Sequence, residues 1–383
     1  MNMTPSEWAM IPAALFSWGT VAAAALITPR ISRPDMFFAV TVHPSFRGSL
    51  AGRGIQRSYD RSVVALALIS LLPVAFARSR IPWLGLAGML APMAVETAGW
   101  IGVFVAARKR TLPHRAEPSA EREAELLPRR VSLPGGWLAQ AGPFLILGIV
   151  CLWLGLRWDG IPARMPIHWN LAGNPDGWSA KNPIAVFGSA IIGLLICSML
   201  LVLWRSTMAG VRRIHGAGPE AIRSARFTRA MALFILGIEY WIALLMSLIG
   251  LAALRPDPTA TLPAFWPILA AQTLLVASIF AIAYRTGQGG WRLGMASTAE
   301  SAEGGGPPVG DRTPDACWKL GMIYFNRDDP ALFVEKRFGV GWTMNMANPK
   351  AGLVLGGILL IAAASIAVSI LIVKGGVSAG SQH

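Results

Sequence analysis

Long uncharged hydrophobic stretches alternate with shorter polar segments along the chain. A transmembrane helix needs about 20 mainly apolar residues to cross the roughly 30 Å hydrocarbon core of a bilayer. By this criterion the pattern predicts eight membrane-spanning helices. They are Trp8–Ile27, Val63–Ala77, Ile81–Ala107, Trp137–Leu156, Pro183–Trp204, Ala230–Leu254, Leu262–Tyr284 and Ala351–Val373. The second fits least well, since it is short and contains Pro73.

Composition agrees with this pattern. Hydrophobic residues make up 54% of the 383 residues and charged residues 14%, whereas soluble globular proteins contain about 25% charged residues. The sequence therefore predicts an all-α membrane protein of about eight transmembrane helices. It also predicts a short extracellular β-hairpin loop and a cytoplasmic accessory segment.

The positive charges follow the predicted topology. Of the 34 Lys and Arg residues, 27 fall in alternate loops and 7 in the others. Basic residues are retained on the cytoplasmic side, so we expect a bacterial plasma membrane protein with both termini extracytoplasmic. Topology accounts for the net charge of +14, so the expected partner is the lipid bilayer and not a nucleic acid. The first ten residues contain no Lys or Arg, so we expect the first helix to be a retained anchor and not a signal peptide.

Changes in composition divide the chain into five regions. The segment between the seventh and eighth predicted spans begins rich in Gly, Ser, Ala and Pro, a composition typical of disorder, and then regains aromatic residues. The predicted regions are a three-span region at 1–135, a membrane module at 136–285 with an outward loop at 157–182, a disordered linker at 286–316, a cytoplasmic aromatic–basic domain at 317–349, and a last helix with its tail at 350–383.

The outward loop has the pattern of a hairpin. Residues 165–170 alternate with a period of two, which is typical of a strand. Residues 173–177, Gly-Asn-Pro-Asp-Gly, are typical of a turn, and Trp178 begins the return strand. We expect the tryptophans to lie at the depth of the lipid headgroups.

Several residues of this loop carry a family resemblance. They are Ile161, Pro162, Pro166, His168, Trp169, Asn170, Gly173, Pro175, Asp176, Gly177, Trp178 and Lys181. The string resembles the signature of a bacterial membrane domain of unknown function that is found in SdpI-type immunity proteins. The resemblance implies a multi-pass protein whose partner is an extracellular peptide toxin. Asn174 departs from the family, which more often has an acidic residue there.

The loop residues admit two interpretations. His168, Asn170, Asp176 and Lys181 either tie the hairpin to itself by hydrogen bonds or contact a ligand or toxin. A single histidine beside one aspartate does not indicate a metal site. The three cysteines, at 151, 197 and 317, also form no metal motif, so we expect neither a metal nor a cofactor.

Two acidic residues lie within the predicted spans. Glu96 and Glu239 each fall near the middle of a helix and on a stripe of small residues. Such stripes allow helices to approach closely, so both carboxylates are expected to face the bundle. They would either hold neighbouring helices together by hydrogen bonds or couple protons or cations to transport.

The predicted cytoplasmic domain has a second resemblance. The residues of interest are Tyr324, Asn326, Asp328, Asp329, Lys336, Arg337, Gly339, Gly341, Trp342 and Asn345. The stretch from Ile323 to Pro349 is similar to another small bacterial domain of unknown function. We expect its basic and aromatic side chains to face the inner leaflet, and the adjacent aspartates to form a capped turn. SdpI-type proteins sequester a repressor at the membrane, so the resemblance also implies a cytoplasmic regulator as a partner.

Together these features favour a non-enzymatic membrane protein of the SdpI type, acting in toxin immunity or envelope signalling. The alternative is a proton- or cation-coupled transporter that uses Glu96 and Glu239. An intramembrane enzyme is not expected, since the sequence contains no HExxH motif and no pair of aspartates within its predicted spans.

Overall fold

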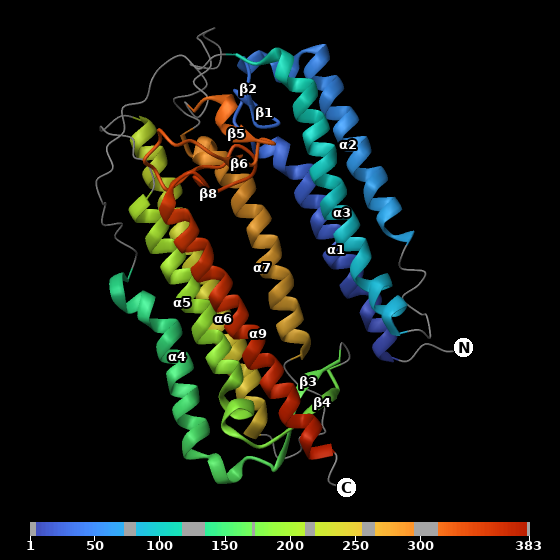
Figure 1. Cartoon of the computed structure of the whole chain (residues 1–383), viewed down its shortest axis with the longest axis vertical. Coiled ribbons are helices and arrows are strands. Elements are labelled where there is room, and N and C mark those ends of the chain that lie inside the picture. The colour runs from blue at the N-terminus through green and yellow to red at the C-terminus, as the bar shows by residue number, and fades with distance from the viewer. Residues whose placement is uncertain are drawn as a thin grey trace.

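The computed structural model describes residues 5–72, 82–116, 135–170, 173–210, 219–254, 265–294 and 313–380. Within these ranges eight long helices run side by side (Figure 1). They are α1 (Pro5–Ile31), α2 (Leu50–Ser70), α3 (Pro82–Thr111), α4 (Gly136–Leu156), α5 (Pro183–Gly210), α6 (Pro219–Leu251), α7 (Phe265–Thr286) and α9 (Pro349–Gly380).

The molecule is a multi-pass membrane protein. Among the described residues, the helices long and apolar enough to cross a membrane are α4, α5, α6, α7 and α9. The predicted helical membrane architecture is confirmed to that extent, while the predicted total of eight spans is not confirmed.

Helix α2 differs most from its prediction. It begins at Leu50, well before the expected start at Val63, and Ser49 caps it by accepting a hydrogen bond from Gly52 N at 3.0 Å. Its first twelve residues contain Arg53, Arg57 and Arg61, which the hydrophobicity criterion had assigned to a loop. An amphipathic half-helix with a serine cap does not satisfy a criterion based on uncharged length. The predicted end of this span, residues 73–77, lies outside the described residues.

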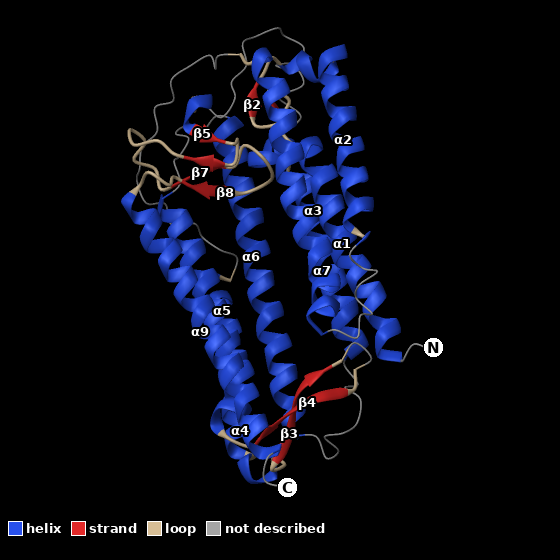
Figure 2. Ribbon diagram, turned by 45° about the vertical axis from the view of Figure 1, so that its right-hand side comes forward, coloured by secondary structure: helices blue, strands red, loops and turns tan. Residues whose placement is uncertain are grey.

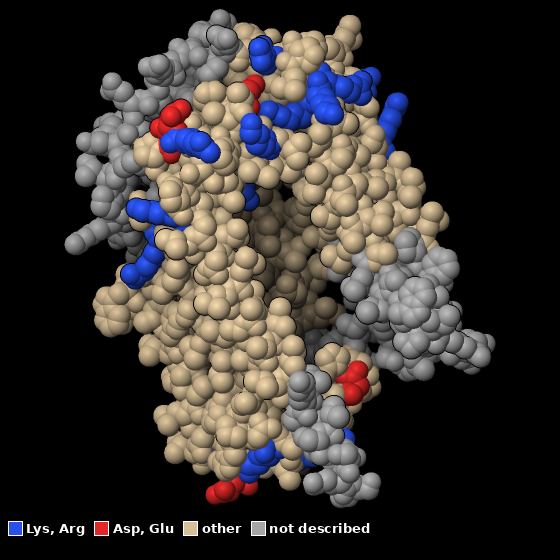
Figure 3. All heavy atoms as spheres, in the orientation of Figure 1, with Lys and Arg blue, Asp and Glu red and all other residues tan. Residues whose placement is uncertain are grey.

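The helices form two groups. Helices α1, α2 and α3 pack together, as do α4, α5, α6 and α9. Helix α7 lies between the groups and contacts α1 (Figure 1). In the second group an added Cβ at Gly188 would lie 2.4 Å from Cδ1 of Ile372, so this glycine lets α5 and α9 approach closely. The surface between the two groups is hollowed (Figure 3).

The short strands lie at the two ends of the molecule (Figure 2). Each described sheet is an antiparallel pair. At one end are β1 (Met36–Phe37), β2 (Val40–Thr41), β5 (Trp318–Lys319), β6 (Ile323–Tyr324), β7 (Phe333–Glu335) and β8 (Trp342–Met344), and at the other are β3 (Arg164–Trp169) and β4 (Pro175–Ala180). Lys and Arg gather mainly at the first end (Figure 3).

Short 3-10 helices complete the described elements. They are η1 (Pro44–Gly48), η3 (Leu112–His114), η4 (Trp158–Gly160), η5 (Ala252–Leu254), η6 (Gln288–Gly294) and η7 (Asp315–Cys317).

The predicted linker at 286–316 has regular structure at its first residues. Thr286 still belongs to α7 and the next residues form η6, while residues 313–316 belong to the described part that includes η7. Gly289 and Gly290 have φ values of 56° and 75° and turn the backbone there. Gln288 is buried, donates to Lys336 O at 2.8 Å and accepts from Arg33 N at 3.1 Å. Residues 295–312 lie outside the described residues.

The segment between α1 and α2 is also compact. Phe37, Phe38 and Val40 are buried against Tyr59 of α2 and Phe104 of α3. Their turn has positive φ at Phe38 (43°) and at Ala39 (59°). Residues other than glycine rarely adopt this conformation, so the surrounding contacts must hold it in place.

Candidate functional site

The predicted hairpin is confirmed and is formed by β3 and β4. Arg164 pairs with Ala180 and Trp169 with Pro175, with irregularities around His168. The turn therefore lies earlier in the sequence than the expected 173–177, since β3 ends at Trp169 and Pro175 already belongs to β4. Gly177 lies opposite His168, and a Cβ added to Gly177 would be 2.7 Å from the His168 Cβ. A larger residue would clash with β3 at that point.

The hairpin is braced by its own polar groups. His168 Nδ1 lies 2.5 Å from Asp176 Oδ1, with side chains 70% and 43% exposed. Asn170 Oδ1 accepts a hydrogen bond from Asn174 N at 3.1 Å. Lys181 does not take part in this bracing, since its ammonium lies over the Trp158 ring at 5.0 Å. The hydrogen bonds expected of His168, Asn170 and Asp176 are present, and whether these residues also contact a ligand stays a prediction.

The indole of Trp169 differs from the polar groups that brace the hairpin. Its indole Nε1 is buried and has no hydrogen-bond partner among the described residues. Buried donors in native proteins are nearly always paired. On the return strand, Arg164 lies over the Trp178 ring at 5.4 Å.

The base of the hairpin is attached to the second helix group. Ile161 and Met165 are buried against Val150, Leu154 and Val186 of α4 and α5. Ser179 Oγ donates to the carbonyl of Ile372 in α9 at 3.2 Å. Through these contacts the hairpin is fixed to α9 as well as to the helices that flank it in sequence.

The two carboxylates that were predicted to lie within spans belong to different helix groups. Glu96 of α3 is 2% exposed, and neither of its carboxylate oxygens has a hydrogen-bond partner among the described residues. Glu239 of α6 is 3% exposed, and its backbone carbonyl accepts a hydrogen bond from Cys197 Sγ at 3.6 Å. Both are buried within the helix groups, as expected from the stripes of small residues. The hydrogen bond from a carboxylate to a neighbouring helix, which was one interpretation, is not seen for Glu96.

The segment 313–348 forms a compact unit at the opposite end from the hairpin, and we call it the clamp segment. Tyr324 OH donates to Asp329 Oδ2 at 2.9 Å, and Asn345 Nδ2 donates to the carbonyls of Asn326 and Asp329. Asp328 N donates to Asn326 Oδ1 at 3.0 Å. The adjacent aspartates thus belong to a capped turn, as predicted. Burial raises the pKa of Tyr324.

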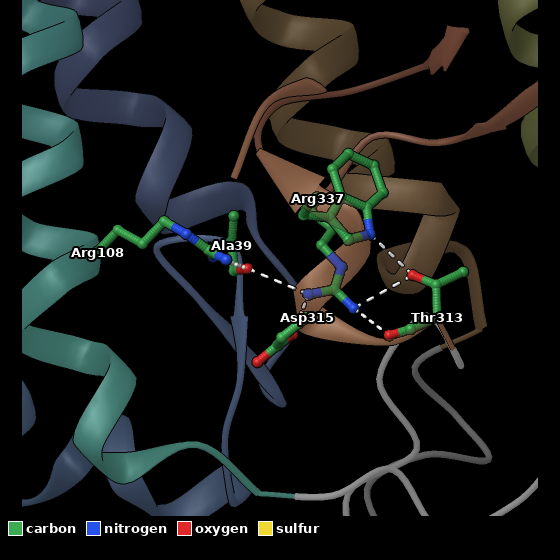
Figure 4. Close-up of polar contacts among 6 residues, drawn as sticks. Ala39, Arg108, Thr313, Asp315 and Arg337 are labelled. Atoms are coloured by element: carbon green, nitrogen blue, oxygen red, sulfur yellow. Dashed lines mark hydrogen bonds and ion pairs between the residues drawn. The ribbon is translucent and has the colours of Figure 1, made fainter. Parts of the chain in front are cut away.

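Arg337 is the most deeply buried charged residue described, with no exposed surface. Figure 4 shows its guanidinium between the clamp segment and the β1–β2 turn. It donates to Ala39 O at 3.3 Å, to Asp315 Oδ1, to Thr313 O and, at 3.2 Å, to Thr313 Oγ1. It also lies 5.2 Å from the centre of the Trp318 ring. A guanidinium presents five donors, so this arrangement pairs most of its hydrogen-bonding capacity inside protein.

A second arginine reaches the same carbonyl from the helix group. Arg108, in the last turn of α3, also donates to Ala39 O. Burial lowers the pKa of Arg108, while Asp315 raises it and Arg337 lowers it further. Two guanidinium groups therefore share one carbonyl, with Asp315 as a nearby counter-charge (Figure 4).

The clamp segment contacts both helix groups through two aromatic side chains. The Phe338 ring lies 4.0 Å from Phe104 and 6.0 Å from Trp100, both in α3. The Trp342 ring lies 5.2 Å from Phe227 of α6. Gly339 and Gly341, with φ values of 90° and 99°, turn the backbone between the two rings.

This arrangement corrects the expectation that the basic and aromatic residues face a lipid leaflet. Arg337 and Phe333 are buried, and Phe338 and Trp342 pack against helices. The buried members of the aromatic–basic set therefore form an interface inside the protein. The other members are exposed, and whether they face the inner leaflet stays a prediction; they are Lys319, Phe325, Arg327 and Lys336.

The sequence did not reveal several partners at this interface. Asp315, Thr313, Arg108 and the Ala39 carbonyl meet Arg337 across as many as 298 residues of chain. Gln288 was assigned to the linker, although it joins Arg33 to Lys336. The spacing of nearby residues in the sequence does not predict such contacts. The one signal in the sequence was that aromatic residues reappear around Arg337.

Two family models match parts of the chain. A domain of unknown function, DUF1648, matches residues 145–194, which run from α4 through the hairpin into α5. A family of unknown function, DUF5808, matches residues 327–352, which include β7, β8 and the start of α9. No curated protein and no solved structure matches the chain. Each match therefore coincides with one of the two structured ends described above.

Proposed function

We propose that the protein is a non-enzymatic receptor of the SdpI type, which binds an extracytoplasmic peptide at the β3–β4 hairpin and reports it to a cytoplasmic regulator at the clamp segment. One observation carries the proposal. Helix α9 begins immediately after the clamp segment and contacts β4 near its other end, where Ile372 O accepts from Ser179. A single helix therefore joins the two ends.

The hairpin has features suited to peptide recognition. His168 and Asp176 are exposed and already oriented by their mutual contact, which reduces the entropy lost on binding. The indole N–H of Trp169, which has no partner among the described residues, would gain one from a peptide carbonyl. The resemblance of this loop to SdpI-type proteins supports a toxin as the peptide.

Protection assays test this proposal. Cells that express the protein are challenged with a panel of membrane-active peptides. Trp169→Ala and Asp176→Asn are expected to lose protection, whereas the matched controls Trp137→Ala and Asp159→Asn, which lie outside the hairpin, retain it. Equal protection by all four variants at equal expression would refute a role for the hairpin.

The proposed orientation has its own test. Cysteines are introduced separately at Asp176, in the hairpin, and at the exposed Lys319, in the clamp segment. A membrane-impermeant thiol reagent added outside intact cells should modify the first and not the second. The reverse result would place the hairpin in the cytoplasm.

The second candidate function is proton- or cation-coupled transport. Its support is the Glu96 carboxylate, which is buried without a hydrogen-bond partner among the described residues; intramembrane ionisable groups commonly mark ion pathways. Glu96→Gln and Glu239→Gln should then abolish flux in reconstituted vesicles, while Asp176→Asn leaves flux unchanged. Unchanged flux and stability in the glutamine variants would remove this candidate.

A further inference from the structure

An apolar groove lies between α6 and α7, with a volume of about 690 Å³. Such a volume is typical of pockets that bind small ligands. Its walls are almost entirely apolar, and at one end lie Arg285 and Thr286. The lining residues include Leu233, Gly237, Trp241, Leu274 and Ser278.

The length of the groove fits one leaflet of a bilayer. Trp241 Nε1 donates to Gln272 Oε1 at 3.0 Å and joins the two helices at one level. From Gln272 to Arg285 the helix rises by about 20 Å, at about 1.5 Å per residue. Half of a hydrocarbon core is about 15 Å. An acyl chain in the groove can therefore reach from the headgroup region at Arg285 to the middle of the membrane.

The charge at the open end favours an anion. Arg285 is exposed and makes no hydrogen bond or ion pair within the described part of the chain. Residues 265–294, which form α7 and η6, contain no Asp or Glu. Exposed Arg229 lies in α6 beside the groove residue Ala230. Nearby, Arg292 lies over the exposed Tyr284 ring at 4.3 Å.

We propose that this groove binds an anionic phospholipid of the surrounding bilayer, with an acyl chain between α6 and α7 and the headgroup phosphate at Arg285. Arginine pairs well with phosphate, and a tyrosine at the level of the headgroups suits the membrane interface. The bound lipid would fill the gap between α7 and the second helix group and so contribute to the position of α7.

Two substitutions separate the acyl-chain contact from the headgroup contact. An added Cβ at Gly237 meets no atom within 4 Å, so Gly237→Leu fills the groove without disturbing the helix. Gly148 of α4 is likewise exposed and open, which makes Gly148→Leu its control. Arg285→Gln removes the charge, and Arg57→Gln removes an exposed arginine from α2, at the same end of the molecule.

The experiment is native mass spectrometry of the full chain in detergent, titrated with phosphatidylglycerol or with phosphatidylcholine. The unaltered protein is expected to bind its first phosphatidylglycerol at least fivefold more tightly than phosphatidylcholine, which corresponds to about 1 kcal/mol per basic residue. Arg285→Gln should abolish most of this preference, and Gly237→Leu should weaken binding of both lipids. The two controls should resemble the unaltered protein.

Three results would overturn the proposal. The first is equal affinity of the unaltered protein for the two lipids. The second is a pair of target variants that behave like their controls. The third is a dimer that Gly237→Leu dissociates, which would assign the groove to a second copy of the chain.

Discussion

At the scale of single residues, the Arg337 guanidinium determines how the clamp segment is held. A buried charge is tolerated only when it is paired and hydrogen-bonded, and Asp315, Thr313 and Ala39 supply these partners. Asp315 keeps 16% of its side-chain surface exposed. The Arg337–Asp315 pair therefore serves mainly to position the clamp segment, because it determines which carbonyl and which carboxylate the segment binds.

Removing the carboxylate should loosen the clamp segment. Asp315→Ala leaves the charge of Arg337 buried with less compensation, and we expect a loss of about 3 kcal/mol, the lower end of the range for buried pairs because Asp315 is partly exposed. Hydrogen exchange of the clamp amides measures the effect. Asp328→Ala, at an exposed site in the same segment, is the control, and an equal effect of both variants would contradict the role given to Arg337.

Tyr324 makes the stability of the protein depend on pH in the alkaline range. Burial raises its pKa above the ordinary value of 10, so as the pH rises past 10 the unfolded state loses the phenol proton first. The folded state is then disfavoured, and stability falls. Tyr324→Phe should cost about 1 kcal/mol at neutral pH through the lost hydrogen bond to Asp329.

Thermal unfolding at pH 8 and pH 10.5 tests this dependence. The unaltered protein should lose more stability between the two pH values than Tyr324→Phe does, since all other titrating groups are common to both. An equal loss in both proteins would contradict the assignment.

At the scale of elements, the sequence predicted those structures whose signals are local. Uncharged length revealed α4, α5, α6, α7 and α9, because a bilayer imposes that length. The predicted boundaries of α4 and α7 lie within three residues of the observed ones, whereas α6 begins at Pro219 and not at Ala230, and α9 ends at Gly380 and not at Val373. Alternation and turn residues revealed the hairpin. The first half of α2 and all of η6 were missed, because an amphipathic half-helix and a glycine-rich turn are stabilised by what they pack against.

The hairpin register depends on a small residue opposite His168. In Gly177→Ala the new Cβ would lie 2.7 Å from the His168 Cβ, so the strands must shift, at a cost of about 1–3 kcal/mol. Hydrogen exchange should show faster exchange in β3 and β4. Gly155→Ala, at an open site near the end of α4, should leave the hairpin unchanged, and no difference between the two would refute the packing argument.

At the scale of the whole molecule, the clamp segment links the two helix groups at one end, where η6 also joins α1 to α6. Phe338 holds it to α3, and Trp342 holds it to α6. Only three residues lie between Phe338 and Trp342 in sequence, so the segment limits how far the groups can separate at that end.

Removing the Trp342 ring should weaken the attachment of the clamp segment to the second helix group. Trp342→Ala removes the contact with Phe227 while Arg337 still binds the β1–β2 turn. We expect a broader distribution of distances between spin labels at Arg57 of α2 and Ile222 of α6. Buried aromatic-to-alanine changes cost about 3–5 kcal/mol, and this half-buried ring should cost less. Phe325→Ala, an exposed residue of the same segment, is the control, and an unchanged distribution for Trp342→Ala would refute the linkage.

The sequence by itself determined that the chain is a helical membrane protein with a braced hairpin between two of its spans. The physical reason is that bilayer thickness, strand periodicity and turn chemistry act over short distances along the chain. Only the tertiary structure decided that Arg337, Phe338 and Trp342 face protein and not lipid. Whether a charged or aromatic side chain is buried depends on partners hundreds of residues away, such as Ala39 and Arg108. The composition of a segment does not reveal which distant residues it will contact.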